Sequence, residues 1–224
     1  MTLPRPPAAV IFDMDGVLFD TERLYERSAL AAAAEHGIGM TSAFFRSTIG
    51  SPWPAIRTLL LEQYGQDAPV DELRATSSRL FRELIETQML LKPGVLELID
   101  LLERLGLPAA IATSSTRPTV ERHLKTYNLA QRFRCIVAHG DYERHKPDPD
   151  PFLKAAEGLA VAPKYCLALE DSHHGVRSAY AAGMMTIMVP DLLPPIDEIR
   201  ALCLHVASDL HEVRRIIVSG HQDT

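Results

Sequence analysis

The sequence predicts an α/β fold in which a Rossmann-like, doubly wound parallel sheet carries an inserted helical domain. Two observations support this class. Short apolar runs that end in polar residues alternate with segments of helical periodicity over most of the chain, which is the pattern of strand-helix units around a parallel sheet. One long stretch, residues 20–91, breaks the alternation and contains only helical patterns. We therefore expect a core formed by residues 1–19 and 92–224 and a helical cap formed by residues 20–91.

Five apolar runs have the length and composition of buried strands. They lie at residues 8–12, 109–112, 135–138, 166–169 and 185–189. Strands that are buried on both faces of a parallel sheet are continuous apolar runs rather than alternating ones. The sequence therefore predicts about five parallel strands in the core.

The segments between these runs have apolar residues at spacings of three and four, as amphipathic helices do. In one of them Val95, Leu98, Leu102 and Leu105 recur at this spacing, and Gly106 is placed to end the helix. Further core helices are predicted at residues 119–127, 152–159 and 172–182. Helices in the insert are predicted at residues 21–36, 53–64 and 70–90.

The composition is that of a soluble globular protein and argues against several functions. The net charge is −6 and no segment is dominated by Lys or Arg, so we expect no nucleic-acid partner. No apolar run approaches the roughly 20 residues of a membrane-spanning helix, and the first residues do not form a secretory signal. Cys135, Cys166 and Cys203 lack metal-site spacing and indicate a reducing compartment. We expect a cytoplasmic protein without membrane contact, as a monomer or a weak dimer.

Polar residues gather where the predicted strands end. In an open α/β sheet ligands bind at the carboxyl ends of the strands, so these residues are candidates for a single site. They are Asp13 and Asp15 after the first strand, Thr113, Ser114 and Ser115 after the second, Lys146 in the loop after the third, and Glu170 and Asp171 after the fourth.

These residue types suit the transfer of a phosphoryl group. Carboxylates gathered in one place repel each other unless a cation lies among them, and oxygen ligands suit Mg²⁺, which is the predicted cofactor. Hydroxyl and backbone N–H groups of Thr113 and Ser114, between a strand and a helix, can hold phosphate oxygens. Asp13 is the candidate nucleophile, shielded from the phosphate by the cation and by Lys146. Asp15 is the candidate acid and base.

Each of these features also has a purely structural interpretation. Two aspartates separated by one residue are common in turns, and a lysine among prolines is commonly a solvated loop residue. Thr113 to Ser115 and Glu170-Asp171 precede predicted helices, where such residues cap the helix or interact with its dipole. The functional interpretation depends on the conjunction, because all of these groups fall at strand ends of the same predicted sheet.

Taken together, the motifs resemble those of the haloacid dehalogenase-like hydrolases. The matching residues are Asp13-Met14-Asp15-Gly16-Val17-Leu18-Phe19-Asp20, Thr113, Lys146-Pro147-Asp148-Pro149 and Glu170-Asp171-Ser172. The resemblance covers nearly the whole core, and the helical insert after the first motif is similar to the C1 cap of that superfamily.

This resemblance implies a role for each motif residue. Asp13 is the nucleophile and Asp15 the acid and base. The Mg²⁺ ion is held by the Asp13 carboxylate, the Asp15 backbone carbonyl and Asp171, with Glu170 in or next to the ligand set. The phosphoryl group is held by Thr113, the Ser114 backbone and Lys146.

The motifs also separate the subfamilies. Asp15 favours phosphoryl transfer, because the dehalogenases themselves lack an acid two residues after the nucleophile. The insert has no lysine, which argues against the phosphonate hydrolases and their Schiff-base lysine. The nearest alternative is β-phosphoglucomutase, which has a histidine in the first cap helix and an arginine after a glycine in the specificity loop. Here Tyr25 and Trp53 stand at those positions, the latter in Gly50-Ser51-Pro52-Trp53, so water is favoured as the acceptor.

The predicted function is Mg²⁺-dependent hydrolysis of a small phosphorylated metabolite through an aspartyl-phosphate intermediate. A sugar phosphate is the favoured substrate, and a phosphosugar mutase like β-phosphoglucomutase is the alternative. Contacts with the substrate are predicted for Ser114, Ser115, Asp20 and Trp53. For Asp20 a helix cap is the alternative role, and for Trp53 it is packing inside the cap.

Overall fold

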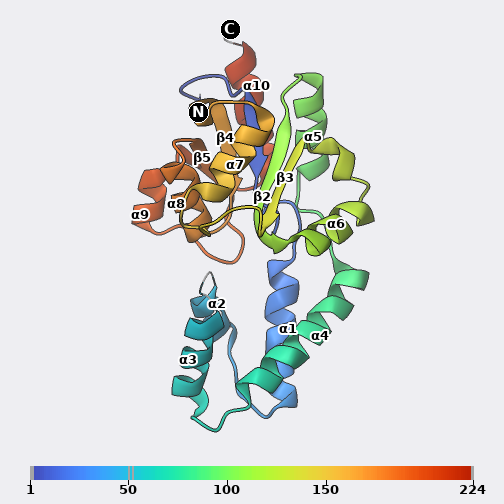
Figure 1. Cartoon of the computed structure of the whole chain (residues 1–224), viewed down its shortest axis with the longest axis vertical. Helices are drawn as coiled ribbons and strands as arrows, with labels where there is room; N and C mark the ends of the chain where they lie inside the picture. Colours follow the sequence, from blue (N-terminus) through green and yellow to red (C-terminus); the bar gives the residue numbers. More distant parts are fainter. Residues whose placement is uncertain (1–2, 50, 52, 223–224) are drawn as a thin grey trace. The chain divides into compact units, whose positions relative to one another are not determined.

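The computed structural model describes residues 3–49, 51 and 53–222. The chain forms two compact units, Met1–Phe19 together with Leu91–Thr224, and Asp20–Leu90 (Figure 1). We call the first unit the core and the second the helical insert. The sequence-based boundary placed Leu91 in the insert, but this residue belongs to the core, because it forms an antiparallel bridge with Phe19.

The core is built around a parallel sheet with the strand order β3-β2-β1-β4-β5-β6. Its strands are β1 (Ala9–Phe12), β2 (Ala109–Thr116), β3 (Cys135–His139), β4 (Cys166–Glu170), β5 (Met185–Met188) and β6 (His205–Val206). Every neighbouring pair is parallel, which confirms the predicted doubly wound sheet. Strand β6 was not predicted, because its two half-buried residues are too few to form an apolar run.

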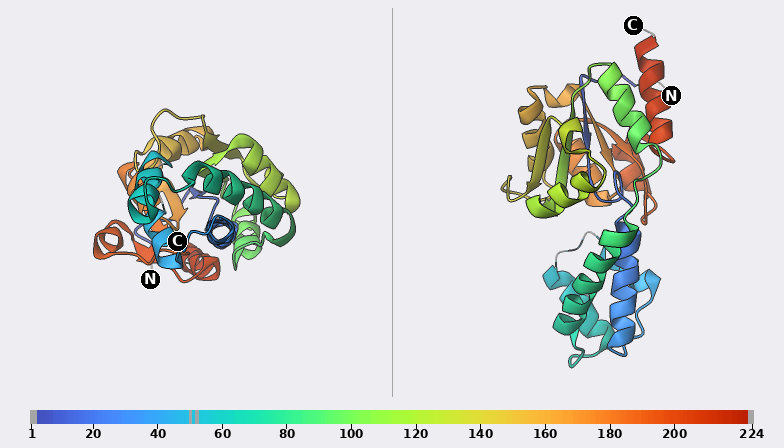
Figure 2. Two further views of the ribbon diagram at one scale, coloured as in Figure 1. Left: turned by 90° about the horizontal axis from the view of Figure 1, so that it is seen from below. Right: turned by 90° about the vertical axis from the view of Figure 1, so that its right-hand side faces the viewer.

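Helices cover both faces of the sheet. The core helices are α5 (Val95–Arg104), α6 (Arg117–Thr126), α7 (Asp150–Leu159), α8 (His173–Ala181), α9 (Asp197–Leu202) and α10 (Leu210–Gln222), with short 3₁₀ turns at Ala130–Arg132 and Pro163–Tyr165. In the right-hand view of Figure 2, α5 and α10 lie side by side on one face of the sheet and α7 lies on the other.

The central strand β1 is buried on both faces. Ile11 packs in a cluster with Phe152 of α7. Because side chains alternate along a strand, Val10 and Phe12 point to the opposite face. All three β1 side chains are completely buried, and each such burial stabilises the fold by about 1.5–3 kcal/mol. This packing fixes the position of Asp13, the next residue in the chain.

The helical insert consists of α1 (Glu22–Glu35), α2 (Ser42–Thr48), α3 (Trp53–Tyr64) and α4 (Val70–Gln88). Helices α1 and α4 pack along each other (Figure 1). The short helix α2 was not predicted. It begins after Thr41, whose hydroxyl accepts a hydrogen bond from the Phe44 N–H at 3.2 Å and so satisfies one of the donors at the helix start.

Aromatic contacts hold the short helices of the insert to the long ones. The Tyr25 ring of α1 makes edge-to-face contacts with Phe45 of α2 and Phe81 of α4. Phe44 of α2 contacts Tyr64 of α3 in the same geometry. Contacts of this kind contribute about 0.5–1.5 kcal/mol each beyond the buried area.

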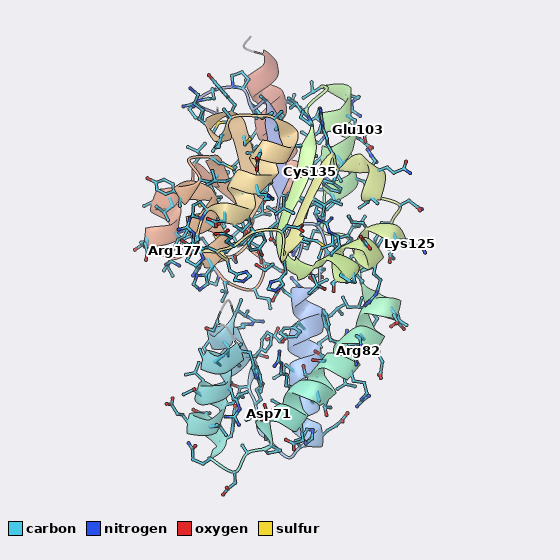
Figure 3. All side chains as sticks on the ribbon, viewed as in Figure 1. Asp71, Arg82, Glu103, Lys125, Cys135 and Arg177 are labelled. Carbon is cyan, nitrogen blue, oxygen red and sulfur yellow. The ribbon has the colours of Figure 1, made fainter. Side chains whose placement is uncertain are left out.

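Charged side chains lie on the outside of both units. Glu103 and Lys125 of the core and Asp71 and Arg82 of the insert are exposed (Figure 3). Among the helices of the described residues, none has the length and hydropathy that crossing a membrane requires.

Candidate active site

The carboxyl ends of β1, β2 and β4 bring the predicted site residues to one edge of the sheet. Strand β1 lies between the other two, with Phe12 opposite Ile111 of β2 and Leu169 of β4. The N–H of Asp13 extends this pairing by donating to the Leu169 carbonyl at 2.9 Å. In chain order β1 is followed by β2 on one side, while β4 lies on its other side. This change of direction is a topological switch point, the place where ligands bind in open α/β sheets.

A buried ammonium group lies between two carboxylates at this edge of the sheet. Lys146, from the loop between β3 and α7, places Nζ 2.5 Å from Asp13 Oδ1 and 2.5 Å from Glu170 Oε1. The same nitrogen donates to the Ala112 carbonyl at 3.0 Å. The side chains of Lys146, Asp13 and Glu170 are 7%, 11% and 0% exposed. When both carboxylates are ionised, the single ammonium group leaves the cluster with an excess of negative charge.

Burial and charge act together on the pKa values of these groups. The pKa of Asp13 is raised to about 8, mainly by burial; the Lys146 charge lowers it, and the Glu170 and Asp15 charges add to the increase. For Lys146, burial lowers the pKa, but the carboxylates of Asp13 and Glu170 outweigh burial and raise it above its ordinary value. The lysine therefore stays charged at neutral pH.

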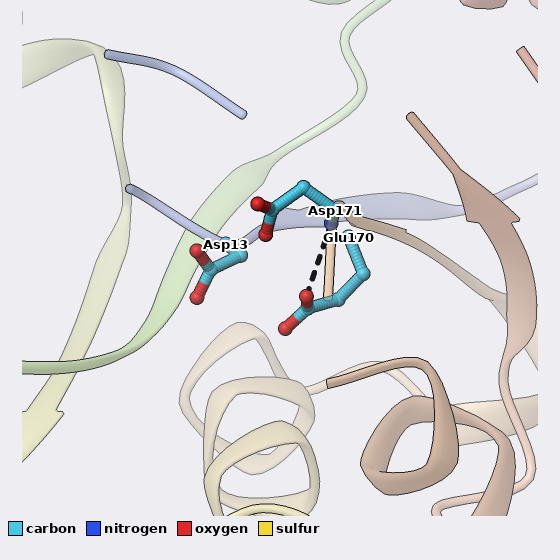
Figure 4. Close-up of side chains that lie close together, drawn as sticks. All are labelled: Asp13, Glu170 and Asp171. Atoms are coloured by element: carbon cyan, nitrogen blue, oxygen red, sulfur yellow. Dashed lines mark hydrogen bonds between the residues drawn. The ribbon is translucent and has the colours of Figure 1, made fainter. Parts of the chain in front are cut away.

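The Glu170 carboxylate is fixed from both sides. Its Oε1 accepts from Lys146, and its Oε2 accepts from the Asp171 N–H at 3.1 Å (Figure 4). The same Oε2 also accepts from the N–H and hydroxyl of Ser172 at 3.2 and 3.1 Å. Ser172 also caps α8 by accepting from the Gly175 N–H at 3.0 Å. A Cβ on Gly175 would lie 1.8 Å from Glu170 Oε1. The first turn of α8 therefore accommodates the carboxylate only because this residue is a glycine.

Three carboxylates are grouped closely enough to bind a cation. Asp13, Glu170 and Asp171 each offer an oxygen, and these oxygens lie within 4.8 Å of one another (Figure 4). A Cβ on Gly16, which has a φ of +80°, would lie 2.2 Å from Asp171 Oδ2, so the glycine allows the carboxylate to approach. An all-oxygen, acidic donor set of this kind fits a hard ion such as Mg²⁺.

The structure brings Asp15 to the end of β2. Its Oδ2 accepts a hydrogen bond from the Ser115 hydroxyl at 2.7 Å. The Ser115 N–H donates to Thr113 Oγ1 at 3.0 Å, and Thr113 is buried whereas Ser114 is exposed. Ser115 was predicted to contact the substrate. In the structure its hydroxyl contacts the carboxylate of the candidate acid and base, and its predicted contact with the substrate stays a prediction.

Asp20 begins the helical insert. Its N–H donates to the Leu90 carbonyl at 2.9 Å, so the first and last residues of the insert are joined. Its carboxylate lies 3.5 Å from Nε of Arg23. These contacts give Asp20 a structural role within the insert, and its predicted contact with the substrate stays a prediction.

Trp53 also belongs to the insert. It lines a cavity of about 60 Å³ together with Tyr25 and Arg74, and the Arg74 guanidinium lies 4.4 Å from the centre of its ring. A cation over the face of a tryptophan ring is an attractive pairing. Gly50 and Pro52, which belong to the loop used to weigh mutase chemistry, lie outside the described residues.

Two residues of the site were not singled out from the sequence. Gly175 faces the Glu170 carboxylate. The one hint of this close approach in the sequence is that a glycine occupies the first turn of a predicted helix. Tyr142, in the loop after β3, donates from its hydroxyl to the Thr113 carbonyl at 3.2 Å. Nothing in the sequence around Tyr142 points to this contact.

Comparison with known proteins identifies the family. Residues 10–189 match the family described as haloacid dehalogenase-like hydrolase. Hexitol phosphatase B of Escherichia coli (strain K12) is 32% identical over 193 residues, which cover 85% of this chain and 86% of that protein. The chain therefore belongs to the haloacid dehalogenase-like hydrolases, as the motifs predicted.

Solved structures of similar proteins share the fold. CbbY from Rhodobacter sphaeroides in complex with phosphate has a TM-score of 0.75 and 26% identity, with 92% of this chain and 96% of that chain covered. A Thermotoga maritima protein, provisionally named a β-phosphoglucomutase, has a TM-score of 0.77 and 26% identity, with 96% and 99% covered.

The contact between Gly175 and Glu170 can be tested with Gly175→Ala. We expect it to lower the free energy of unfolding by about 2 kcal/mol, because the added methyl overlaps a carboxylate that its hydrogen bonds hold in place. An alanine in an open helix position would instead stabilise by up to about 1 kcal/mol. Urea denaturation followed by circular dichroism measures the difference.

Tyr180→Ala is the matched control, because Tyr180 lies on the same helix and is 54% exposed. The double variant Gly175→Ala/Glu170→Asp shortens the acid and should recover part of the loss. A Gly175→Ala protein as stable as the wild type would show that Glu170 is not held where we describe it.

Proposed function

We propose that this protein is a Mg²⁺-dependent phosphatase that hydrolyses small phosphate esters, with Asp13 as the nucleophile. The observation that carries the proposal is the Lys146 ammonium group 2.5 Å from both Asp13 and Glu170, beside an acidic cluster that includes Asp171. A carboxylate that attacks a negatively charged phosphate needs positive charge nearby to offset the repulsion between the two anions. Membership of the hydrolase family and the phosphatase name of a relative support the same conclusion.

In the first step one oxygen of Asp13 attacks the phosphorus while Lys146 holds the other. The new bond joins the aspartyl oxygen to phosphorus, and the bond from phosphorus to the leaving oxygen breaks. Asp15 donates a proton to that oxygen, so the alcohol leaves neutral. In the second step Asp15 takes a proton from water, which attacks the phosphorus and releases Asp13 as a carboxylate together with inorganic phosphate.

The phosphoryl oxygens are held by groups of this chain at the end of β2 and in the loop after β3. Thr113, the Ser114 backbone N–H and the Lys146 ammonium are the proposed donors. Ser115, bonded to Asp15 at 2.7 Å, directs that carboxylate. Mg²⁺ would be held by Asp13, Asp171 and the Asp15 backbone carbonyl, with Glu170 beside them, and would supply positive charge that offsets the repulsion between nucleophile and phosphate.

The favoured substrate class is a sugar or sugar-alcohol phosphate, because the similar hexitol phosphatase B is named for one. Mutase chemistry is the second candidate and is supported by the Thermotoga maritima structure. Against it, Tyr25 stands where the mutases have a histidine, and its ring packs between Phe45 and Phe81. We therefore propose water as the acceptor.

Asp13→Asn tests the nucleophile. We expect turnover of p-nitrophenyl phosphate to fall by about 10³-fold or more, because an amide does not attack phosphorus. EDTA should abolish the wild-type rate and Mg²⁺ should restore it. Asp197→Asn, an exposed aspartate in α9, is the matched control and should keep the wild-type rate.

Two results would contradict this assignment. An Asp13→Asn rate within tenfold of wild type would show that Asp13 is not the nucleophile. A wild-type rate unchanged by EDTA would show that the reaction does not depend on a metal ion. Incubation with β-glucose 1-phosphate and a bisphosphate primer separates the two candidates. Free phosphate supports hydrolysis, and glucose 6-phosphate supports the mutase.

Mg²⁺ affinity should rise with pH. Because burial holds the pKa of Asp13 at about 8, Mg²⁺ must displace a proton below that pH. The logarithm of the affinity should increase by up to about one per pH unit between roughly pH 6 and 8 and level off above. Calorimetric titrations in buffers of different ionisation enthalpy count the released protons.

Asp13→Asn is the control for this titration, since an amide has no proton to release and its weaker affinity should vary little with pH. A wild-type affinity that falls with rising pH, or binding without proton release at pH 6, would show that Asp13 is ionised before the metal binds.

A further inference from the structure

Strand β2 does not pair regularly to its end. Ala112 pairs with Val137 of β3, and the next pair is Thr116 with His139. Three residues of β2, Thr113 to Ser115, therefore stand opposite the single residue Ala138. Such a bulge removes residues from the hydrogen-bond ladder and redirects their side chains, and bulges are frequent beside active sites.

The bulge contains the residues proposed to hold the phosphoryl group. Its internal bond runs from the Ser115 N–H to Thr113 Oγ1, and the Ser115 hydroxyl reaches Asp15. The Thr113 carbonyl lies in the part of β2 that the ladder omits. A buried carbonyl outside the ladder needs another donor, since leaving it without one costs about 1–3 kcal/mol.

Tyr142 supplies that donor. Its hydroxyl donates to the Thr113 carbonyl at 3.2 Å. Burial raises the pKa of Tyr142, although a hydrogen bond with Ser114 and the Lys146 charge oppose this. The hydroxyl is therefore protonated and able to donate at neutral pH.

The turn before Tyr142 is fixed to the neighbouring elements. Asp141 Oδ2 accepts from the Ala138 N–H at 2.8 Å and from the Arg117 guanidinium at 2.5 Å. Arg117 is the first residue of α6, directly after β2, and it also donates to the Ile136 carbonyl at 2.9 Å. These bonds join the loop after β3 to β3 itself and to Arg117, which follows the bulged segment.

The Tyr142 ring contacts a histidine, which in turn stacks on a second one. His145 meets the Tyr142 ring edge to face with the ring centres 5.3 Å apart, and His139 stacks on His145 at 4.9 Å. His145 directly precedes Lys146, whose Nζ donates to the Ala112 carbonyl at 3.0 Å. Side chains of one loop thus bond the carbonyls of two consecutive residues at the end of β2.

We infer that Tyr142 is a positioning residue of the active site, which holds the β2 bulge so that Thr113 and Ser114 present their donors to the phosphoryl group. The inference rests on the proposed phosphatase function. Tyr142 acts through the Thr113 carbonyl and does not contact the reacting atoms. The Tyr142 hydroxyl thereby couples the two segments that bind the anion, the bulge and the Lys146 loop.

Tyr142→Phe in the full-length protein removes the hydroxyl and keeps the ring. We expect kcat/KM for p-nitrophenyl phosphate to fall about tenfold. The competitive inhibition constant of inorganic phosphate should rise about fivefold, because the bulge is released and its donors are no longer aligned. The melting temperature should change by less than about 4 °C. Tyr180→Phe, on an exposed tyrosine, is the matched control.

The phosphate inhibition constant separates positioning from a general loss of stability, which would not change it at temperatures where the variant is folded. Tyr142→Phe values within twofold of Tyr180→Phe for both kcat/KM and phosphate inhibition would overturn the inference. So would a lower melting temperature with an unchanged inhibition constant. A wild-type protein that releases no phosphate would contradict the proposed function itself, and the inference with it.

Discussion

The contact of the Lys146 ammonium with the carboxylates of Asp13 and Glu170 is the interaction on which the site depends. Each of these charges is buried, and a buried charge without a partner costs several kcal/mol. Here Lys146 is bonded to both acids and to the Ala112 carbonyl, so its desolvation is offset. When Asp13 is ionised, one cation does not neutralise two carboxylates and the neighbouring Asp171. The remaining negative charge makes the same cluster suited to a metal ion and, once that ion is present, to a phosphate.

The sheet topology is what brings these groups together. Asp13 and Glu170 follow β1 and β4, which are neighbours in the sheet although more than 150 residues separate them. Lys146 comes from the loop after β3 and reaches across the end of β2. Glycines provide the space, because a side chain at Gly16 would overlap Asp171 and one at Gly175 would overlap Glu170. The site is therefore built from strand ends and from two places where no side chain is tolerated.

Much of this arrangement follows from the sequence, because a parallel sheet places polar residues at one edge wherever buried apolar runs end. From the sequence alone, that rule predicts that Asp13, Thr113, Lys146 and Glu170 lie at this edge. Features that depend on the pairing register of the strands could not be predicted from the sequence. The β2 bulge shifts the pairing with β3 by two residues, and the hydrogen bond from Tyr142 to the Thr113 carbonyl depends on this bulge. Short elements such as β6 and α2 were missed, since they contain too few residues to form a periodic pattern.

If Asp13 is the nucleophile, its carboxylate becomes covalently phosphorylated during turnover. The most direct test is to quench the reaction with acid in the first turnovers on a radiolabelled phosphate ester and to map the labelled peptide. We expect label on the peptide that contains Asp13, and hydroxylamine should remove it, as it removes an acyl phosphate. Label that resists hydroxylamine and maps to Thr113 or Ser114, or turnover without any labelled protein, would contradict the assignment of Asp13 as the nucleophile.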